Sequence, residues 1–190
     1  MKNWKLYFGL LIIAVMTVSA CTKSDGIAKN DKLIVYYSLT DYTKIAADYI
    51  QSLTGADIFR LEPLDPYSLE IYETIERASV ELENKDYPQL VGGIENLEDY
   101  NIIFIGSPNW FGTLSLPVFS FLEAHDLSGK TIVPFITYGG GGFEDTITDL
   151  KILLPKASFL PEFGVIGVDV ENSKPDIMQW LMNINILEEE

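Results

Sequence analysis

The sequence is poor in the side chains that most often build metal sites and hydrolytic active sites. It contains one cysteine, Cys21, and one histidine, His125. A single cysteine cannot form a disulfide within the chain, and no cluster resembles a zinc site with histidine or thiolate ligands. His125 follows a predicted helix, where capping the helix end is an ordinary role. We therefore expect neither hydrolase chemistry nor a metal site.

Basic residues are also scarce. The chain has 13 Lys and Arg residues against 28 Asp and Glu residues, and its formal charge at pH 7 is −15. A protein that binds nucleic acid needs positive charge to neutralise phosphates, so we expect no nucleic-acid partner. An acidic surface instead favours partner proteins that carry basic patches.

The one long apolar run lies at the N-terminus and is too short to span a bilayer. It extends from Leu6 to Val18, follows two lysines, and falls below the roughly 20 residues that a membrane-spanning helix needs. Small residues and Cys21 come next, as in a secretory signal. Val18 to Cys21 resembles a bacterial lipobox, which would make Cys21 a lipidation site. The alternative is a free or intermolecularly paired thiol.

These features predict three parts of the chain. Residues 1–20 are expected to be a lipoprotein signal peptide, and residues 21–31 a polar tether that carries the lipidated Cys21. Residues 32–190 are long enough for one domain with a sizeable core. On this prediction the domain is extracytoplasmic and is held by its lipid at the bacterial cell membrane or outer membrane.

The folded part begins with an apolar strand that stops abruptly at a group of hydroxyls. Residues 33–37 are apolar, β-branched or aromatic, which is typical of a strand buried on both faces. Ser38, Thr40 and Thr43 follow, where a helical pattern begins. A helix N-terminus offers unpaired N–H groups and partial positive charge, which suit a phosphate. The same hydroxyls could also be simple helix caps, and both interpretations stay open.

The rest of the chain alternates between strand and helix patterns. We expect strands at 33–37, 57–61, 100–105, 131–136 and 163–168, and helices at 43–53, 68–83, 116–124, 143–153 and 176–187. Five strands that alternate with five helices predict an α/β fold with a parallel sheet covered on both faces.

Three loops should meet at the carboxyl ends of these strands, where α/β sheets bind ligands. They are residues 38–43, 107–115 and 137–143. The second contains Trp110 and Phe111, which could stack on a flat ring or fold back on a neighbouring helix. The third is glycine-rich, and it could approach a ligand closely or be only a flexible connection. Together the loops indicate a site for a phosphorylated planar cofactor.

The chain resembles the flavodoxin family over residues 32–187. The resemblance rests on YYSLTDYT, ADIFRLEPLDPY, GSPNWFGTLSLPVFSFLE, LSGKTIVPFITYGGGG and FGVIGV. It implies a three-layer α/β/α sandwich whose five-stranded parallel sheet has the order 2-1-3-4-5. It also implies non-covalent FMN and electron transfer.

Carried over onto this sequence, the family's pattern assigns three groups of residues to FMN and none to a catalytic or metal role. The phosphate group would lie at Ser38, Leu39, Thr40, Asp41, Tyr42 and Thr43. The isoalloxazine would be flanked by Pro108, Asn109, Trp110, Phe111, Gly112 and Thr113, and its polar edge would meet Tyr138, Gly139, Gly140, Gly141 and Gly142.

Asp41 departs from the family's usual Thr-Gly-x-Thr loop. Asp tolerates a left-handed backbone, so the shape of the loop can survive. Two like charges about 4 Å apart repel by roughly 4 kcal/mol at an effective dielectric near 20, and by much less when one faces water. The sequence leaves both orientations of the carboxylate open.

The expected function is that of an exported, membrane-anchored electron carrier of low potential. Acidic surroundings disfavour a negatively charged reduced flavin. We expect a monomer and a redox partner protein with a basic docking patch. Two alternatives stay open: an NAD(P)H-dependent FMN or quinone reductase, and a flavin-free lipoprotein binding module on the same fold.

Overall fold

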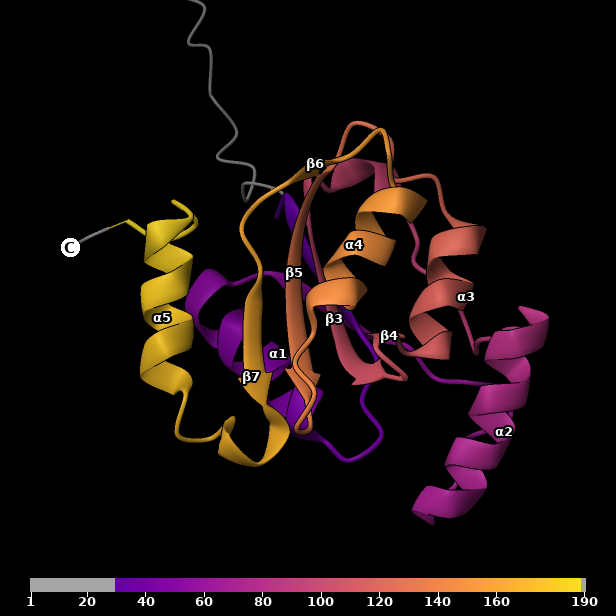
Figure 1. The fold of residues 1–190 in the computed structure, drawn as a ribbon. Coiled ribbons are helices and arrows are strands. Elements are labelled where there is room, and N and C mark those ends of the chain that lie inside the picture. The colour runs from indigo at the N-terminus through magenta and orange to yellow at the C-terminus, as the bar shows by residue number, and fades with distance from the viewer. Residues whose placement is uncertain (1–29, 189–190) are drawn as a thin grey trace, which may run out of the picture.

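The domain has three layers, with a sheet between two sets of helices (Figure 1). The computed structural model describes residues 30–188. The predicted signal peptide, Cys21 and all but the last two residues of the predicted tether therefore lie outside the described residues. Within residues 30–188, no helix is both long and apolar enough to cross a membrane.

The strands confirm the expected parallel order and revise the expected number. Their order is β2-β1-β3-β5-β6, with β7 also paired to β5 and a short β4 antiparallel to β3. The sheet thus has seven strands rather than five. Their bounds are β1 Lys32–Tyr36, β2 Asp57–Arg60, β3 Ile102–Trp110, β4 Thr113–Leu114, β5 Thr131–Tyr138, β6 Ser158–Phe159 and β7 Phe163–Ile166.

Two short strands, β6 and β7, together occupy the edge of the sheet next to β5. β6 pairs with the beginning of β5, and β7 pairs with its end. Pro161 lies between them and has no N–H to donate to a ladder. The predicted strand 163–168 corresponds to β7, and its last residues instead form the 3-10 helix η2, Gly167–Asp169.

The predicted end of the third strand was wrong. It was expected to end at residue 105, before Gly106, but β3 continues to Trp110 and remains paired with β5 as far as Pro108. The neighbour on its other side, β1, ends opposite Gly106, so Pro108 faces no strand there that would need its missing N–H.

β3 then turns back into β4 through a tight hairpin. Phe111 and Gly112 form the turn with φ values of 55° and 82°, and positive φ at both central positions is typical of a two-residue hairpin loop. Trp110, which was expected in a loop, is therefore held on a strand.

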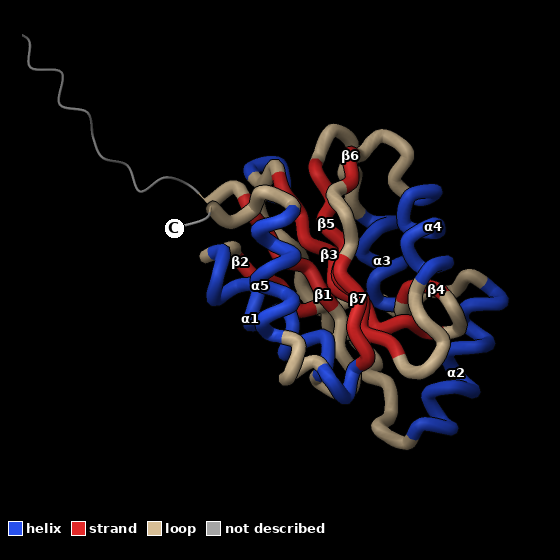
Figure 2. The backbone as a smooth tube through the Cα atoms, turned by 60° about the vertical axis from the view of Figure 1, so that its left-hand side comes forward, coloured by secondary structure: helices blue, strands red, loops and turns tan. Residues whose placement is uncertain are grey.

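The helices cover both faces of the sheet. Buried residues of α1 and α5 pack on one face, and those of α2, α3 and α4 pack on the other, as the turned view in Figure 2 also shows. The bounds are α1 Tyr42–Thr54, α2 Ile71–Asn84, α3 Leu116–Ala124, α4 Glu144–Leu153 and α5 Lys174–Asn183, with a further 3-10 helix, η1, at Leu97–Asp99.

The bounds of three helices can be compared with the predicted ranges. α3 has the predicted bounds. α2 starts later than predicted because Ser68 organises a turn: its hydroxyl accepts the Glu70 N–H at 3.1 Å, and its carbonyl accepts the Thr74 hydroxyl at 2.6 Å. α5 ends earlier because Asn185 has a left-handed φ of 58°.

β1 lies inside the core and separates its two halves. Leu33 and Val35 pack with α2, α3 and α4, whereas Ile34 and Tyr36 pack with α1 and α5. This alternation is the period of a strand buried on both faces. It continues beyond the strand, so Tyr36 and its neighbour Tyr37 lie on opposite faces of the sheet.

The tight contact between β3 and β5 predicts a large effect of Gly106→Ala. A Cβ atom on Gly106 would lie 2.2 Å from Cζ of Phe135, whose side chain is fully buried. We expect a loss of about 1–3 kcal/mol in the free energy of unfolding, measured with urea. Gly93→Ala is the control, because no atom lies within 4 Å of its added Cβ. Equal stability of the two variants would contradict the packing described for β3.

Candidate functional site

The carboxyl ends of β1, β3, β5 and β7 surround a cavity of about 440 Å³, called the first cavity below. This volume lies within the usual range for small-molecule sites. The predicted site residues that line it are Ser38, Leu39, Thr40, Tyr42, Thr43, Pro108, Asn109, Trp110, Tyr138 and Gly139. The three loops that were expected to meet therefore do meet.

The loop from β1 to α1 presents a row of unpaired backbone donors. None of the N–H groups of residues 39–43 has a hydrogen-bond partner within the described part of the chain. Asp41 makes the turn into α1 with a left-handed φ of 61°, as expected for a residue that replaces glycine there. N–H groups at the start of a helix bind anions well, so this loop can hold a phosphate group.

The hydroxyls of this loop differ in what they contact. Thr43 Oγ1 lies 2.8 Å from Thr137 Oγ1, and this buried contact joins the start of α1 to the end of β5. Ser38 is 3% exposed, yet no hydrogen bond to its hydroxyl is found among residues 30–188. None of the three hydroxyls caps α1, because the residue at the cap position is Asp41 and its side chain makes no capping hydrogen bond. The cap interpretation was therefore wrong for this helix.

Arg60 controls the charge around the loop. Its Nη2 donates to the carbonyl of Ser38 at 2.8 Å and lies 3.4 Å from Oδ1 of Asp41. The Asp41 side chain is 63% exposed. Its carboxylate therefore faces water and a guanidinium, which weakens its repulsion of an anion at the N–H groups.

Trp110 is held by the rings of two tyrosines. Its ring meets Tyr37 and Tyr67 edge to face, with ring centroids 5.6 Å and 5.0 Å apart. Both contacts have the T-shaped geometry that aromatic pairs favour. The partly buried Trp110 ring thus lines the first cavity in one defined orientation.

Asn109 ties the second loop to the third. Its side-chain amide donates to the carbonyl of Gly142 at 3.0 Å and to Oγ1 of Thr146 at 2.9 Å. Its side-chain oxygen accepts the N–H of Gly112 at 3.0 Å. One side chain therefore sets the spacing between the β3–β4 hairpin and the glycine loop.

Several predicted residues do not line the cavity. Asp41 points outward, Phe111 and Gly112 form the hairpin turn, and Thr113 donates its hydroxyl to Asp149. Gly140, Gly141 and Gly142 follow Gly139 in the loop that leads to α4. What these residues bind remains a prediction.

Sequence reasoning missed some lining residues and the contribution of Arg60. The added lining residues are Ile71, Thr137, Ile166, Gly167 and Val168. Thr137 and Ile166 to Val168 could have been found, because they stand at the carboxyl ends of predicted strands. No sequence pattern marks Ile71 or Arg60, because only the tertiary fold brings them next to these loops.

Among residues 30–188, no group of three His, Cys, Asp or Glu side chains is placed to hold a metal ion. His125 follows α3, with its Nδ1 2.9 Å from the carbonyl of Phe121, as expected for a residue at a helix end.

Comparison with known proteins gives one family. Residues 31–184 match a family model described as flavodoxin. No curated protein matches the chain.

Solved structures give the same fold. A protein described as a flavoprotein from Bacteroides eggerthii is 30% identical, with a TM-score of 0.72, and the match covers 82% of this chain and 98% of that one. One from Bacteroides uniformis is 25% identical, with a TM-score of 0.71, covering 80% and 98%. A flavoprotein from Lactobacillus acidophilus, solved in complex with FMN, is 21% identical, with a TM-score of 0.65, covering 75% and 97%.

Proposed function

The chain belongs to the flavodoxin family, and on this premise we propose that it binds FMN in the first cavity and transfers electrons. The observation that carries the proposal is the loop at residues 39–43, whose N–H groups have no partner in the part of the chain that the structure describes. These groups lie at the edge of a cavity that is also lined by Trp110 and Tyr138. A phosphate and a flat ring are the two parts of FMN that such a site fits.

Different residues of the chain would hold different parts of the cofactor. The N–H groups of residues 39–43 would bind the phosphate, and Arg60 would steady the loop through the Ser38 carbonyl and offset the charge of Asp41. Trp110 would cover the ring, and Asn109 would keep the two ring-binding loops at a constant spacing. When bound, FMN supplies the redox chemistry, and the protein sets its potential.

The acidic composition supports a low potential and a basic partner. With a formal charge of −15, the protein disfavours further negative charge on a bound group. A redox partner would dock through a basic patch, and the protein itself would act as a monomer.

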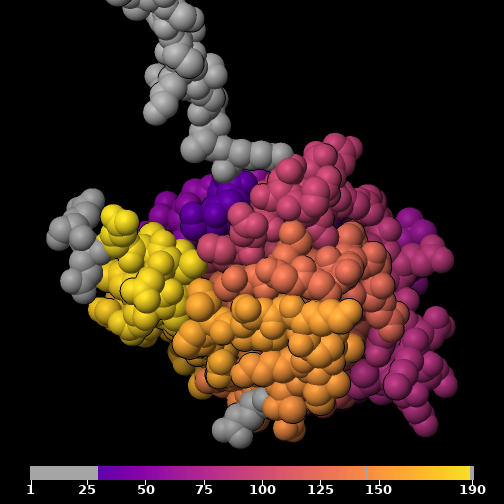
Figure 3. All heavy atoms as spheres, turned by 90° about the horizontal axis from the view of Figure 1, so that it is seen from above, coloured from indigo at the N-terminus to yellow at the C-terminus, as the bar shows by residue number. Residues whose placement is uncertain are grey.

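We also propose that the domain is exported and held at a membrane through a lipid on Cys21. Residue 30, where the described chain begins, lies at the end of the sheet opposite the first cavity. Asn30 donates there to the carbonyl of Gly55 at 2.6 Å, and Figure 3 views the molecule from that end. The proposed anchor would therefore join the domain at the end opposite the first cavity.

Binding of FMN is the first test. We expect the soluble domain, from residue 30 onward, to show the visible bands of bound flavin with quenched fluorescence. Arg60→Gln should weaken FMN binding about fivefold, because it leaves the Asp41 carboxylate unpaired near the phosphate. Asp41→Asn should change the affinity by less than about threefold, because its carboxylate faces water.

The double variant Asp41→Asn with Arg60→Gln is the matched control. Because both charges are removed, we expect its affinity to recover from that of Arg60→Gln, and any loss that remains measures the hydrogen bond from Arg60 to the Ser38 carbonyl. A tenfold gain on Asp41→Asn alone would show that the carboxylate faces the phosphate. A folded domain that binds no FMN would contradict the proposed function.

Stepwise reduction tests the role as a carrier. The loaded protein should take up electrons in two separate one-electron steps, because acidic surroundings lower the second potential, which adds negative charge. A separation of about 59 mV corresponds to a tenfold difference in equilibrium constant. A single two-electron step, together with steady oxidation of NAD(P)H in the presence of a quinone, would instead favour the reductase alternative.

Cys21→Ser tests the anchor. The full chain expressed in a bacterium should be found with the membranes, and the variant should be found in the soluble fraction, because serine offers no sulfur for a lipid. Thr22→Ser is the control and should stay with the membranes. Unchanged membrane association of Cys21→Ser would rule out the proposed lipid anchor.

A further inference from the structure

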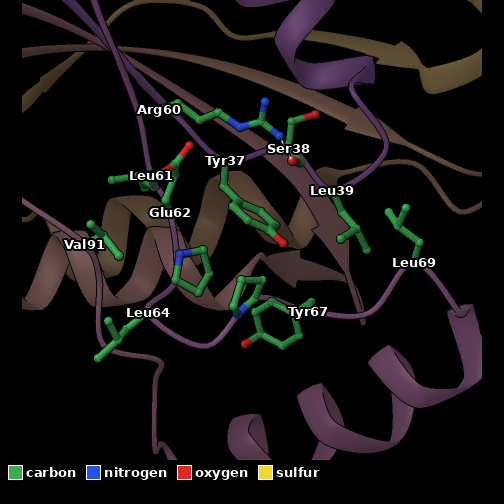
Figure 4. Close-up of a pocket in the computed structure, with 12 residues that line it drawn as sticks. Tyr37, Ser38, Leu39, Arg60, Leu61, Glu62, Leu64, Tyr67, Leu69 and Val91 are labelled. Carbon is green, nitrogen blue, oxygen red and sulfur yellow. Dashed lines mark hydrogen bonds between the residues drawn. The ribbon is translucent and has the colours of Figure 1, made fainter.

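A second cavity of about 470 Å³ lies beside the first and shares Ser38 and Leu39 with it (Figure 4). Its apolar wall is formed by Leu61, Pro63, Leu64, Pro66, Leu69 and Val91.

The wall of the second cavity is tied together by backbone hydrogen bonds. The N–H of Leu64 donates to the carbonyl of Gln89 at 2.7 Å, and the N–H of Val91 donates to the carbonyl of Glu62 at 2.8 Å. Pro63 pairs with Leu90 between these two bonds. Because two distant segments are joined in this way, the space between them and the end of β1 is preformed.

Two hydroxyls that line the second cavity, those of Ser38 and Tyr37, have no hydrogen-bond partner among the described residues. The side chain of Tyr37 is only 4% exposed, and no hydrogen bond to its hydroxyl is found within residues 30–188. Figure 4 shows its ring among the lining residues, with the hydroxyl on the side of Leu39 and Tyr67. The hydroxyl of Tyr67, in contrast, donates to Glu81. Burial raises the pKa of Tyr37, so its hydroxyl stays protonated and can donate a hydrogen bond.

The charges of the second cavity favour a neutral ligand. Arg60 lines it, but the guanidinium already pairs with Asp41 and with the Ser38 carbonyl. Glu62 lies at the same wall and would repel an anion. An acceptor that binds Tyr37 here is therefore better uncharged, and the surrounding tyrosine rings and aliphatic side chains suit a flat, apolar body.

We propose that the second cavity binds a neutral, flat, carbonyl-bearing ring of the quinone class, with the Tyr37 hydroxyl donating to a carbonyl oxygen. Such a ligand would lie close to the first cavity, because Trp110 lines that cavity and also contacts the rings of both Tyr37 and Tyr67. Binding here needs no flavin, so it can succeed or fail independently of the proposed function.

The test uses menadione, a neutral naphthoquinone, as the probe. It is titrated into the ¹⁵N-labelled domain with and without FMN, and amide shifts are followed by NMR. We expect saturable shifts at residues that line only the second cavity, such as Leu61, Leu64 and Val91, in both samples. Shifts centred on Thr137 to Gly139, or shifts that FMN abolishes, would place the probe in the first cavity and overturn the proposal. No saturable shift up to the solubility limit of menadione would also overturn it.

Tyr37→Phe and Tyr36→Phe form a matched pair. The two residues are neighbours in the chain, and each variant removes one tyrosine hydroxyl. Only Tyr37 lines the second cavity, because Tyr36 packs on the opposite face of the sheet. Loss of one hydrogen bond should weaken menadione binding about five- to tenfold in Tyr37→Phe and leave it unchanged in Tyr36→Phe. Equal affinities for the two variants would overturn the role of Tyr37.

A second pair of variants changes exposed residues, so the test does not depend on whether the variants of the buried tyrosines fold. Val91→Trp fills the mouth of the second cavity from a position that is 48% exposed, and Val80→Trp makes the same change at a 53% exposed position on α2 away from it. We expect at least tenfold weaker menadione binding in Val91→Trp only. Unchanged binding in Val91→Trp would overturn the location. An FMN titration of each variant reports separately on the first cavity.

Discussion

The burial of β1 is the constraint on which the rest of the structure depends. This strand pairs with a neighbour on each side and packs against helices on both faces, so the position of its end is set by the whole core. The chain must then turn at once into α1, and Asp41 makes this turn with a left-handed backbone. The turn leaves the N–H groups of residues 39–43 beside the first cavity, with no hydrogen-bond partner among residues 30–188. The position of these N–H groups thus follows from how β1 ends.

Local charge at this site differs from the charge of the whole protein. A chain with a formal charge of −15 is expected to repel a phosphate. At the loop, however, the backbone N–H groups of residues 39–43 lie beside the cavity, and Arg60 from β2 meets Asp41, the acidic side chain of this loop. Interactions over a few ångströms outweigh the net charge, because solvent screens distant exposed charges much more than close pairs.

The two cavities share a wall and are therefore linked in structure. Ser38 and Leu39 border both of them, and the edge-to-face contacts of Trp110 with Tyr37 and Tyr67 connect their aromatic linings. A molecule in one cavity would contact the side chains that also shape the other. If occupancy of one changes affinity in the other, the effect must be reciprocal.

The sequence by itself determined the fold class, the strand order implied by the family resemblance, and the three loops of the first cavity. These follow from local signals: apolar runs, helix periodicity, and glycine and hydroxyl residues at strand ends. Only the tertiary structure decided that β3 continues through Pro108, because that depends on where β1 stops beside it. It also decided that Arg60 meets Asp41, and that the Tyr37 hydroxyl lines a second cavity without a hydrogen-bond partner in the described part of the chain. Such contacts join residues far apart in the chain, and no local pattern encodes which of them will face each other.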